Sequence, residues 1–596
     1  MNQTYSLNWD LDIFFPGGSQ SPQFQEYVKK LEQDVQRFDH QVKAFPQKEA
    51  EDLDTWHSLF LTLQDLFKRL TESSSFVSCL EAADMKDEAP KIIRGRLEQI
   101  SASLGSTLTL LDDQLLKLSE DFFQTLLQDS RFQPIAFSLK ERRDRAKEKM
   151  DPGMESLAGD LSVDGYHAWG ELYYLIVGRM SIPYEEKGEV KQLSVGQASN
   201  KMTSGNRAVR KEIFNKLNDA WEQEENLLLS TLNHLSGYRL QLYRHRKWDS
   251  VLKEPLALNR MSEKTLQTMW KVIDGNKQPL LSYFQRKASL LGVDKLSWYD
   301  VYAPLSEEEQ TLSYDEAANF ILEHFGRFDS RLQEFALRAF QERWIEAEDR
   351  PGKRPGGFCT SFGESNQSRI FMTFSGSATN VSTLAHELGH AYHSYVMKDL
   401  PPMAKNYAMN VAETASTFAE LIVADASIQA AKSKEQKIAL LEDKIQRSAA
   451  FFMDVHARFL FESRFYEQRK QGPVSAEQVK KLILEAQREA FHDGLDEYHP
   501  YFWAAKLHFF ITGMPFYNFP YTFGYLFSTG LYGKALTEGP QFAEKYVDLL
   551  RDTGRMSVEE LANKHLGVDL TQPTFWQDAV DLVHDDIRQF LALTEK

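Results

Sequence analysis

The sequence predicts a mainly α-helical protein built from two or more lobes. Apolar residues recur three and four positions apart over long segments, which is typical of helices with one buried face. At 596 residues the chain is longer than a single hydrophobic core usually supports, so we expect more than one lobe. One glycine-rich region departs from the helical pattern and predicts a small β-element.

The helical period is clearest in four segments, which are residues 24–45, 107–128, 314–344 and 435–468. A stretch around Pro183, Gly188 and Gly196 interrupts the helices, because proline and glycine weaken a helix interior. We therefore place a domain boundary near residue 195. It divides the chain into an N-terminal helical domain, residues 1–195, and a larger C-terminal domain, residues 196–596.

The glycine-rich region covers residues 354–380. Its paired glycines predict a turn, "RIFMTFS" (residues 369–375) predicts a strand, and Gly376 predicts the exit from that strand. The strand leads directly into the next helix, which Asn380 or Ser382 could cap. We expect the edge of this strand to border whatever site that helix carries.

Composition and charge limit the classes of function. The contents of 42% apolar and 26% charged residues are ordinary for a soluble globular protein, and the net charge of −17 argues against nucleic acid as a partner. Two cysteines in so long a chain indicate a reducing compartment. No signal peptide is visible at the start, and prolines interrupt the most apolar stretch, residues 508–527. We therefore predict a cytoplasmic protein with no membrane contact and no obligatory protein partner.

The predicted helix carries the motif "HELGH", residues 386–390. With 15 His and 86 Asp+Glu in 596 residues, chance predicts at most about 0.05 matches to His-Glu-x-x-His. His386 and His390 stand one turn apart, so both imidazoles can bind one zinc ion, and Glu387 can act on the attacking water. Gly389 costs roughly 1 kcal/mol in a helix interior, which suggests that something approaches closely there. A surface helix with two solvated histidines, the alternative, explains neither the glycine nor the strand.

A catalytic zinc usually takes three protein ligands. We expect the third from "NVAETASTFAELIVADA", residues 410–426, where Glu413, Thr417 and Glu420 share one face of a predicted helix. An acid at Glu413, among apolar residues, is costly to bury unless it binds a metal or a partner. Glu413 is therefore the predicted third ligand. Glu420 either orients a ligating histidine or is an ordinary solvated acid.

"TLAHELGHAYH" followed by "VAETASTFAE" resembles the oligoendopeptidase F branch of the thimet-oligopeptidase family of zinc metallopeptidases. The resemblance extends to "HFFITGMPFYNFPYTFGYLFS" (residues 508–528) and to the tail "SVEELANKHLGVDLTQPTFW" (residues 557–576). It implies a two-lobed helical bowl with a deep central channel, a small β-sheet beside the metal helix, one zinc per chain and short peptide substrates. The sequence departs from the family at Asn380, where an Asp is often seen.

The segment after His508 holds three tyrosines, Tyr517, Tyr521 and Tyr525. Aromatic residues at helical spacing are more often core than catalytic when considered alone. The resemblance implies instead that a histidine and tyrosine hydroxyls stabilise the oxyanion. We favour His508, Tyr517 and Tyr525 for this role, with Tyr521 behind them. Two other histidines, His492 and His499, are weaker candidates.

The predicted function is zinc-dependent endopeptidase action on short unstructured oligopeptides, with Glu387 as general base. A dipeptidyl carboxypeptidase on the same scaffold is one alternative, and it would need a cation placed to hold the terminal carboxylate of the substrate. A catalytically silent peptide-binding protein is a second, although the intact metal-binding motif argues against it. The third alternative is a structural helical protein without metal, and it does not explain why His386, Glu387, His390 and Glu413 occur together.

Overall fold

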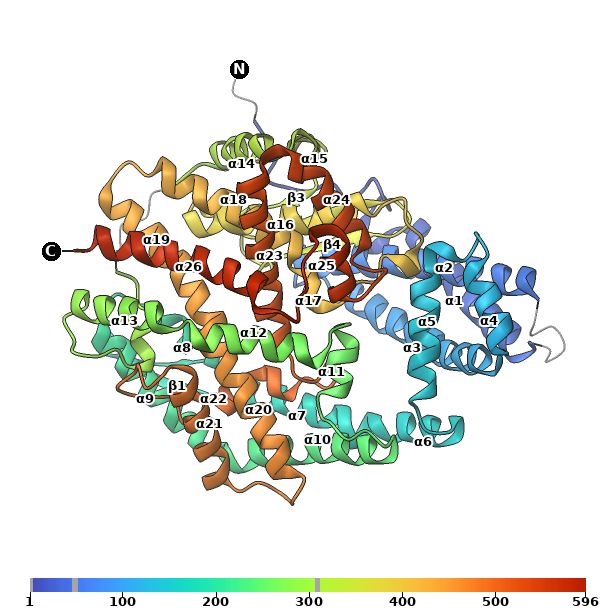
Figure 1. The fold of residues 1–596 in the computed structure, drawn as a ribbon, viewed down its shortest axis with the longest axis horizontal. Coiled ribbons are helices and arrows are strands. Elements are labelled where there is room, and N and C mark those ends of the chain that lie inside the picture. Colours follow the sequence, from blue (N-terminus) through green and yellow to red (C-terminus); the bar gives the residue numbers. More distant parts are fainter. Residues whose placement is uncertain (1–3, 46–51, 306–310, 596) are drawn as a thin grey trace.

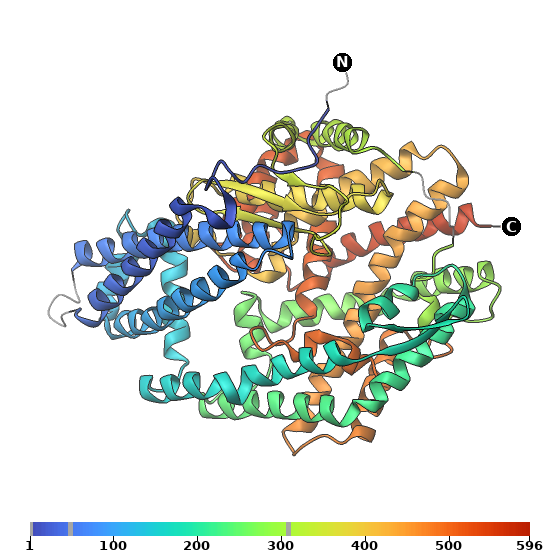
Figure 2. The same cartoon turned by 180° about the vertical axis from the view of Figure 1, so that it is seen from behind.

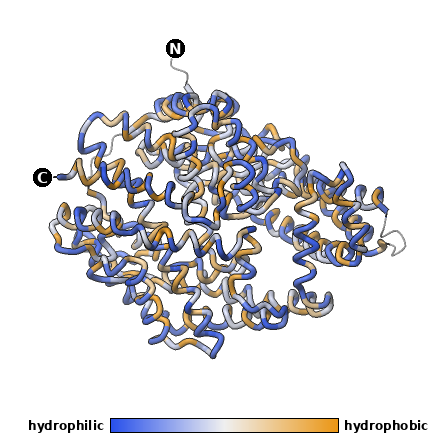
Figure 3. The backbone as a smooth tube through the Cα atoms, viewed as in Figure 1, coloured by the Kyte–Doolittle hydropathy of each residue, from blue (hydrophilic) through white to orange (hydrophobic). Residues whose placement is uncertain are grey.

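The computed structural model describes residues 4–45, 52–305 and 311–595. Helices dominate, and the strands within these residues form one hairpin and one three-stranded sheet. In Figures 1 and 2 the N-terminal helices form a separate lobe beside a larger helical body. Figure 3 shows apolar and polar residues alternating along most helices, as expected where one face is buried. The predicted mainly α, two-lobed fold is confirmed. Within the described ranges, no helix is long and apolar enough to cross a membrane.

The N-terminal lobe is a bundle with its own hydrophobic core. Its helices are α1 (Pro22–Lys43), α2 (Leu53–Ala83), α3 (Ala89–Lys117), α4 (Glu120–Gln128) and α5 (Ala136–Lys147). The start of α1 is fixed by Ser21, whose hydroxyl accepts from the N–H of Phe24, and by Pro22 at the first position. Phe362 and Met403, far along the chain, complete this core, so the lobe is packed against the region that carries the site.

A second core joins residues on both sides of position 195. Its elements are α7 (Ala168–Arg179), β1 (Ile182–Glu186), β2 (Glu189–Leu193), α8 (Val195–Lys201), α9 (Arg207–Gln223), α10 (Glu225–His245), α20 (Val455–Arg469), α21 (Ala476–Ala490) and α22 (Phe502–Ala505). The helix α6 (Pro152–Ser162) leads into it from the N-terminal lobe, as Figure 1 shows. The domain boundary near residue 195 stays a prediction.

The largest core lies in the C-terminal part. Its helices are α11 (Lys253–Leu258), α12 (Glu263–Gly275), α13 (Gln278–Leu290), α14 (Tyr314–Phe328), α15 (Ser330–Gln341), α16 (Ala378–Val396), α17 (Met409–Ala412), α18 (Thr414–Ala430), α19 (Lys434–Ala449), α23 (Phe519–Glu538), α24 (Phe542–Asp552), α25 (Val558–Leu566) and α26 (Pro573–Leu593). The motif helix α16 is therefore held inside the largest packed body of the molecule.

A three-stranded sheet lies beside α16. Its strands are β3 (Ile345–Glu346), β4 (Phe358–Phe362) and β5 (Gln367–Phe371), in the order β3-β5-β4. The predicted strand is β5, and it is central: it runs parallel to β3 and antiparallel to β4, with Phe358 opposite Phe371. The prediction that the edge of this strand borders the site is wrong, because the segment that follows the paired glycines, where no strand was expected, forms β4 and takes the edge.

Candidate metal centre and active site

The helix α16 begins one turn before the predicted caps. Ser377 is the cap: its hydroxyl accepts from the N–H of Asn380, while the Asn380 side chain accepts from Ser375. One apolar face of α16 is buried in the core. His386 and His390 lie on the other face, with side chains 26% and 22% exposed, so both imidazoles remain accessible to a ligand.

Gly389 lies where α18 crosses α16. A Cβ atom at this position would lie 2.5 Å from the carbonyl oxygen of Ala415 and 2.6 Å from Cα of Ser416. Only glycine permits this approach of the two backbones, since real Cβ atoms essentially never come so close. The close approach expected from the sequence is thereby confirmed, and it brings the start of α18 directly beside the two histidines.

Glu413 occupies the junction between α17 and α18. The sequence predicted one continuous helix here, but the chain breaks at Glu413, which ends α17 and precedes α18. The side chain is held by the hydroxyl of Ser416, which donates to Oε2 at 2.7 Å. Gly524 of α23 packs against the Glu413 stem, where a Cβ would lie 3.3 Å from that of Glu413. Thr417 and Glu420 nevertheless line the same cavity as Glu413, as the helical spacing predicted.

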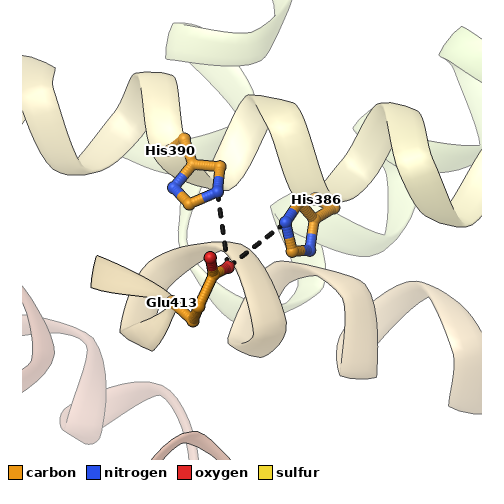
Figure 4. A group of neighbouring side chains, drawn as sticks. All are labelled: His386, His390 and Glu413. Carbon is orange, nitrogen blue, oxygen red and sulfur yellow. Dashed lines mark ion pairs between the residues drawn. The ribbon is translucent and has the colours of Figure 1, made fainter. Parts of the chain in front are cut away.

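The three predicted ligands converge in the structure (Figure 4). Oε2 of Glu413 lies 3.3 Å from Nε2 of His386 and 3.4 Å from Nε2 of His390. Donor atoms bound at about 2.0–2.1 Å around a tetrahedral zinc lie about 3.3–3.4 Å apart, so the observed spacing fits one such ion. The donors, two imidazoles and one carboxylate, also match a catalytic zinc site.

The electrostatics of Glu413 favour its role as an anionic ligand. Burial acts to raise the pKa of this carboxyl group, but hydrogen bonds and charge from His386 and His390 outweigh burial. The net effect holds the pKa of Glu413 well below its usual range. The carboxylate is therefore ionised at neutral pH, as metal binding requires.

Glu387 is buried beside His386, His390 and Glu413. Its side chain is 7% exposed, and Oε2 has no hydrogen-bond partner in the described part of the chain. Burial raises the pKa of Glu387, the direction expected for a proton acceptor and donor. A Cβ at Gly357, just before β4, would lie 3.5 Å from Oε1 of Glu387, so β4 starts next to this carboxylate.

Glu420 lies on the far side of the His386 ring from Glu413. Its Oε2 is 3.3 Å from Nδ1 of His386, and its other oxygen is paired with Arg447 of α19. A carboxylate that accepts from the second ring nitrogen fixes the orientation and tautomer of a ligating histidine. Arg447 was not predicted from the sequence, because an arginine in an amphipathic helix is ordinarily a solvated side chain.

His508, Tyr517 and Tyr521 form an aromatic group. The His508 ring is 5.5 Å from that of Tyr517 and 6.1 Å from that of Tyr521. Burial lowers the pKa of His508 to about 4, with Arg458 and Lys506 acting in the same direction. His508 is therefore neutral at pH 7, and its Nδ1 has no partner among the described residues. Tyr521 lines the same cavity as His386 and Glu387.

Tyr525 also borders that cavity, but its hydroxyl is engaged elsewhere. The side chain is 3% exposed, its ring stacks on Phe451, and its hydroxyl shares a 2.7 Å hydrogen bond with Ser448. The weaker histidine candidates lie outside the group: His499 is buried against Phe214, and His492 pairs with Asp274.

Glu462 of α20 holds the loop that carries Tyr517. It accepts from the backbone N–H of Phe516 at 3.2 Å and from the side-chain amide of Asn518 at 2.6 Å. Phe516 has a φ of 54°, a strained value for a bulky residue, so the loop needs such support. Burial raises the pKa of Glu462 to about 8. No local pattern indicates this role, because Glu462 lies 55 positions before Tyr517.

Two cavities meet at the candidate metal ligands His386, His390 and Glu413. One, of about 420 Å³, is lined by Glu420, Arg447 and Tyr521, and the other, of about 350 Å³, by β4 and His390. His386, Glu387 and Glu413 line both. The cluster is thus open to a ligand from two sides, the arrangement that a chain passing through the site requires.

Two family models match the chain: Peptidase family M3 over residues 201–582 and Oligopeptidase F over residues 114–181. Group B oligopeptidase PepB of Streptococcus agalactiae is 25% identical over 89% of both chains. Oligopeptidase PepF of Bacillus subtilis is 23% identical over 95% of this chain and 84% of its own.

Among solved structures, oligoendopeptidase-F from Enterococcus faecium has a TM-score of 0.71 at 18% identity, covering 96% of this chain and 98% of its own. At this identity the likeness concerns the fold. The Peptidase family M3 match, by contrast, covers more than half of the 596 residues and includes His386, His390 and Glu413. The chain therefore belongs to peptidase family M3, in its oligoendopeptidase F branch, and is a metallo-oligopeptidase.

Proposed function

We propose that the protein is a zinc-dependent endopeptidase that hydrolyses peptide bonds in short unstructured oligopeptides. The observation that carries this proposal is the convergence of His386, His390 and Glu413 at 3.3–3.4 Å, with the buried Glu387 carboxylate beside them. His386, His390 and Glu413 would hold one zinc per chain. Bound zinc would polarise the scissile carbonyl and activate water.

Glu387 acts as the general base. Its buried carboxylate, free of protein partners at Oε2, takes a proton from the attacking water and delivers it to the leaving amine. The raised pKa supports the first step, because a carboxylate that binds a proton more tightly is a better proton acceptor.

His508 and the tyrosines stabilise the negative charge that develops on the carbonyl oxygen. A neutral imidazole and phenol hydroxyls can all donate hydrogen bonds to an oxyanion. The grouping of His508, Tyr517 and Tyr521 supports assigning Tyr521 to this set with Tyr517. Tyr525 keeps its proposed role only if its hydroxyl can leave Ser448 for the substrate.

The substrate is proposed to lie along β4. This strand is at an edge of its sheet, and Gly357, Phe358 and Cys359 line the cavity that contains His386 and Glu387. An extended peptide can add its backbone hydrogen bonds to such an edge, largely regardless of side chains. Folded proteins cannot present an extended segment in this space. We also propose that residues 196–596 form the catalytic domain, that 1–195 form a helical domain, and that the protein is cytoplasmic.

Two measurements test the proposed function. Metal analysis of the purified protein should find about one zinc per chain, and His386→Ala, His390→Ala and Glu413→Ala should each lose tight binding. Mass spectrometry of products from a mixed peptide pool should show internal cleavage, and Glu387→Gln should keep zinc but lose activity by several orders of magnitude. Release of C-terminal dipeptides alone would favour the dipeptidyl carboxypeptidase, and peptide binding without products would favour the silent binding protein.

A further test concerns substrate size. One good cleavage sequence is presented twice, as a free peptide and within a rigid loop of a stable protein. Cavities of about 350–420 Å³ beside the candidate ligands have room for an extended chain and not for a folded domain, so we expect a much higher kcat/KM for the free peptide. Equal values for both would contradict the restriction to unstructured peptides, whatever the metal chemistry.

A further inference from the structure

A third cavity, of about 460 Å³, adjoins the metal site. It lies between the N-terminal lobe and the sheet, where α2 and α5 face β4 and the segment after α16. Ser361, Ser394 and Tyr407 line both this cavity and the one that contains His390 and Glu413. The space beside the metal cluster therefore continues toward the N-terminal lobe.

The lining of this cavity is cationic, although the chain as a whole has a net charge of −17. It includes Lys68, Arg142 and Lys405, and none of the lining residues that the structure describes is acidic. Arg142 is neutralised by Asp112, whose Oδ1 lies 2.7 Å from its Nε. The charge available to a ligand is therefore that of the two lysines.

Neither lysine has an acidic partner in the described ranges. Lys405 donates to the backbone carbonyl of Lys398 at 2.9 Å and to the Asn366 side chain at 3.3 Å. Lys68 is exposed, and its side chain makes no hydrogen bond or ion pair within the same ranges. Asp399, whose charge also reaches Lys405, lies 3.9 Å from Arg551. Two cations without acids, at the wall of a cavity, attract an anionic ligand.

The two ammonium groups also act on each other. Burial lowers the pKa of Lys405, and the positive charge of Lys68 lowers it further, against the opposing effect of Asp399. Like charges that face one space repel, and a carboxylate placed between them would relieve that repulsion.

The strand β4 connects this cavity with the metal site. Gly357 lies beside Glu387, and Gly363, just past the other end of β4, packs against the backbone of Lys68. At about 3.3 Å per residue, the distance from Gly357 to Gly363 is roughly 20 Å. Ser75 of α2 already occupies the Thr360 hydroxyl and the Ser361 carbonyl, so a peptide can pair only with the start of β4. An extended peptide that continues from there through the adjoining cavities would reach the lysines roughly four to six residues from the scissile bond, allowing for the length of the lysine side chains.

We propose that Lys68 and Lys405 form a subsite for a carboxylate group of the peptide substrate, several residues from the bond that is cleaved. This inference rests on the proposed peptidase function and adds a preference to it. The carboxylate is either the C-terminus of the peptide or an acidic side chain. A dipeptidyl carboxypeptidase would need its cation nearer, two residues from the cleaved bond.

The test uses one unstructured peptide with a single cleavage site in three forms. The first carries a free C-terminus and a glutamate on each side of the site, four to six residues away. In the second the C-terminus is amidated, and in the third the glutamates are glutamine. The metal-loaded wild type should show a kcat/KM about tenfold lower for whichever form lacks the recognised carboxylate, the usual effect of one charge-assisted hydrogen bond. Whichever form shows the loss identifies the source.

Variants then locate the preference. The ratio of kcat/KM between charged and uncharged peptides should fall toward one in Lys68→Met, and Lys68→Glu should invert it. Lys405→Arg, which keeps the charge, should retain the ratio, and Lys405→Met should reduce it. Lys481→Met, at an exposed lysine of α21, is the matched control and should leave the ratio unchanged. Added salt should reduce the wild-type ratio by screening.

Binding of the same peptides to metal-loaded Glu387→Gln, followed by fluorescence anisotropy, measures the preference without turnover. Equal binding and equal kcat/KM for all three peptides would overturn the inference, as would an undiminished ratio in both Lys68→Met and Lys405→Met. A wild type that hydrolyses none of the peptides, while Lys68-dependent binding persists, would instead contradict the proposed function and support the subsite.

Discussion

Oε2 of Glu420 lies 3.3 Å from Nδ1 of His386, on the opposite side of the ring from Glu413. The imidazole is therefore held between two carboxylates, one proposed as a fellow ligand and the other as an orienting acceptor. Arg447 and Asp443 continue the chain of ion pairs behind Glu420. The orientation of His386 is thus set by residues of α18 and α19 as well as by its own helix.

The first prediction concerns Glu420. Glu420→Ala should weaken zinc affinity by about 10- to 100-fold, because the orienting partner of His386 is lost. Glu413→Ala should remove tight binding altogether. Competition with a chromophoric chelator measures both affinities, with Glu435→Ala, at an exposed position of α19, as the control. Full zinc occupancy in Glu413→Ala, with loss in Glu420→Ala, would reverse the two assignments.

A second prediction concerns the crossing of α16 and α18. Gly389→Ala places a methyl group 2.5 Å from the Ala415 carbonyl, so α18 must shift and take Glu413 with it. We expect a loss of roughly 1–3 kcal/mol in stability together with weaker zinc binding. Gly178→Ala in α7, where a Cβ meets nothing within 4 Å, is the control. Wild-type zinc affinity in Gly389→Ala would show that the backbone contact does not position Glu413.

The third prediction separates the tyrosines. Tyr517→Phe or Tyr521→Phe should lower kcat by about 10²–10³ with little change in peptide binding, if the lost hydroxyl donates to the oxyanion. Tyr525→Phe is compared with Ser448→Ala, which removes the partner of the Tyr525 hydroxyl and leaves the phenol intact. A fall in kcat in Tyr525→Phe alone would give Tyr525 its predicted catalytic role. An unchanged kcat in all three phenylalanine variants would return the segment to a structural role.

Glu462 provides a fourth prediction, as a positioning residue. Glu462→Gln replaces one of the two accepting oxygens by an amide that cannot accept, so the loop that carries Tyr517 loses a hydrogen bond. We expect kcat to fall while KM changes little. If Glu462 acts through Tyr517, the double variant Glu462→Gln/Tyr517→Phe should be no slower than Tyr517→Phe. Additive losses would show that Glu462 acts by another route.

The fifth prediction is a dependence of stability on pH. The pKa of His508 falls from 6.5 to about 4 on folding, so between these values the unfolded chain binds a proton that the native protein does not. The contribution of His508 to the free energy of unfolding is complete above pH 6.5 and is lost as the pH falls toward 4. His508→Gln does not titrate, so its melting temperature should fall less than that of the wild type between about pH 7 and about pH 5. An equal fall in melting temperature in the variant and the wild type would contradict a neutral, buried His508.

Much of the fold and of the metal cluster could be predicted from the sequence, because both depend on local periodicity. The spacing of His386 and His390 on one helix fixes their convergence, and Gly389 signalled a close approach at that point of the helix. The Glu413 junction was missed, since an alanine-rich segment gives no local reason for a helix to break there. β4 was missed because "FCTSF" is short and directly follows the paired glycines that predict a turn.

Residues whose role depends on a distant partner could not be predicted. Arg447 matters because α19 passes behind α18, and Glu462 because α20 passes behind the Tyr517 loop; each is an ordinary charged residue in its own segment. The hairpin β1–β2 was another omission, although Lys187 and Gly188, both with positive φ, form a turn at its tip. Contacts between segments that are far apart in the sequence, rather than local conformational preferences, determine these features.

The contact of α18 with Gly389 has a thermodynamic consequence. The histidines and Glu413 are carried by backbones that touch, so their relative placement is established when the protein folds and not when the metal arrives. We expect such a site to behave as a rigid receptor: removal of a bound ion by a chelator would leave the ligands in place, and readdition would restore binding without refolding. Metal exchange and protein turnover would then be separate events.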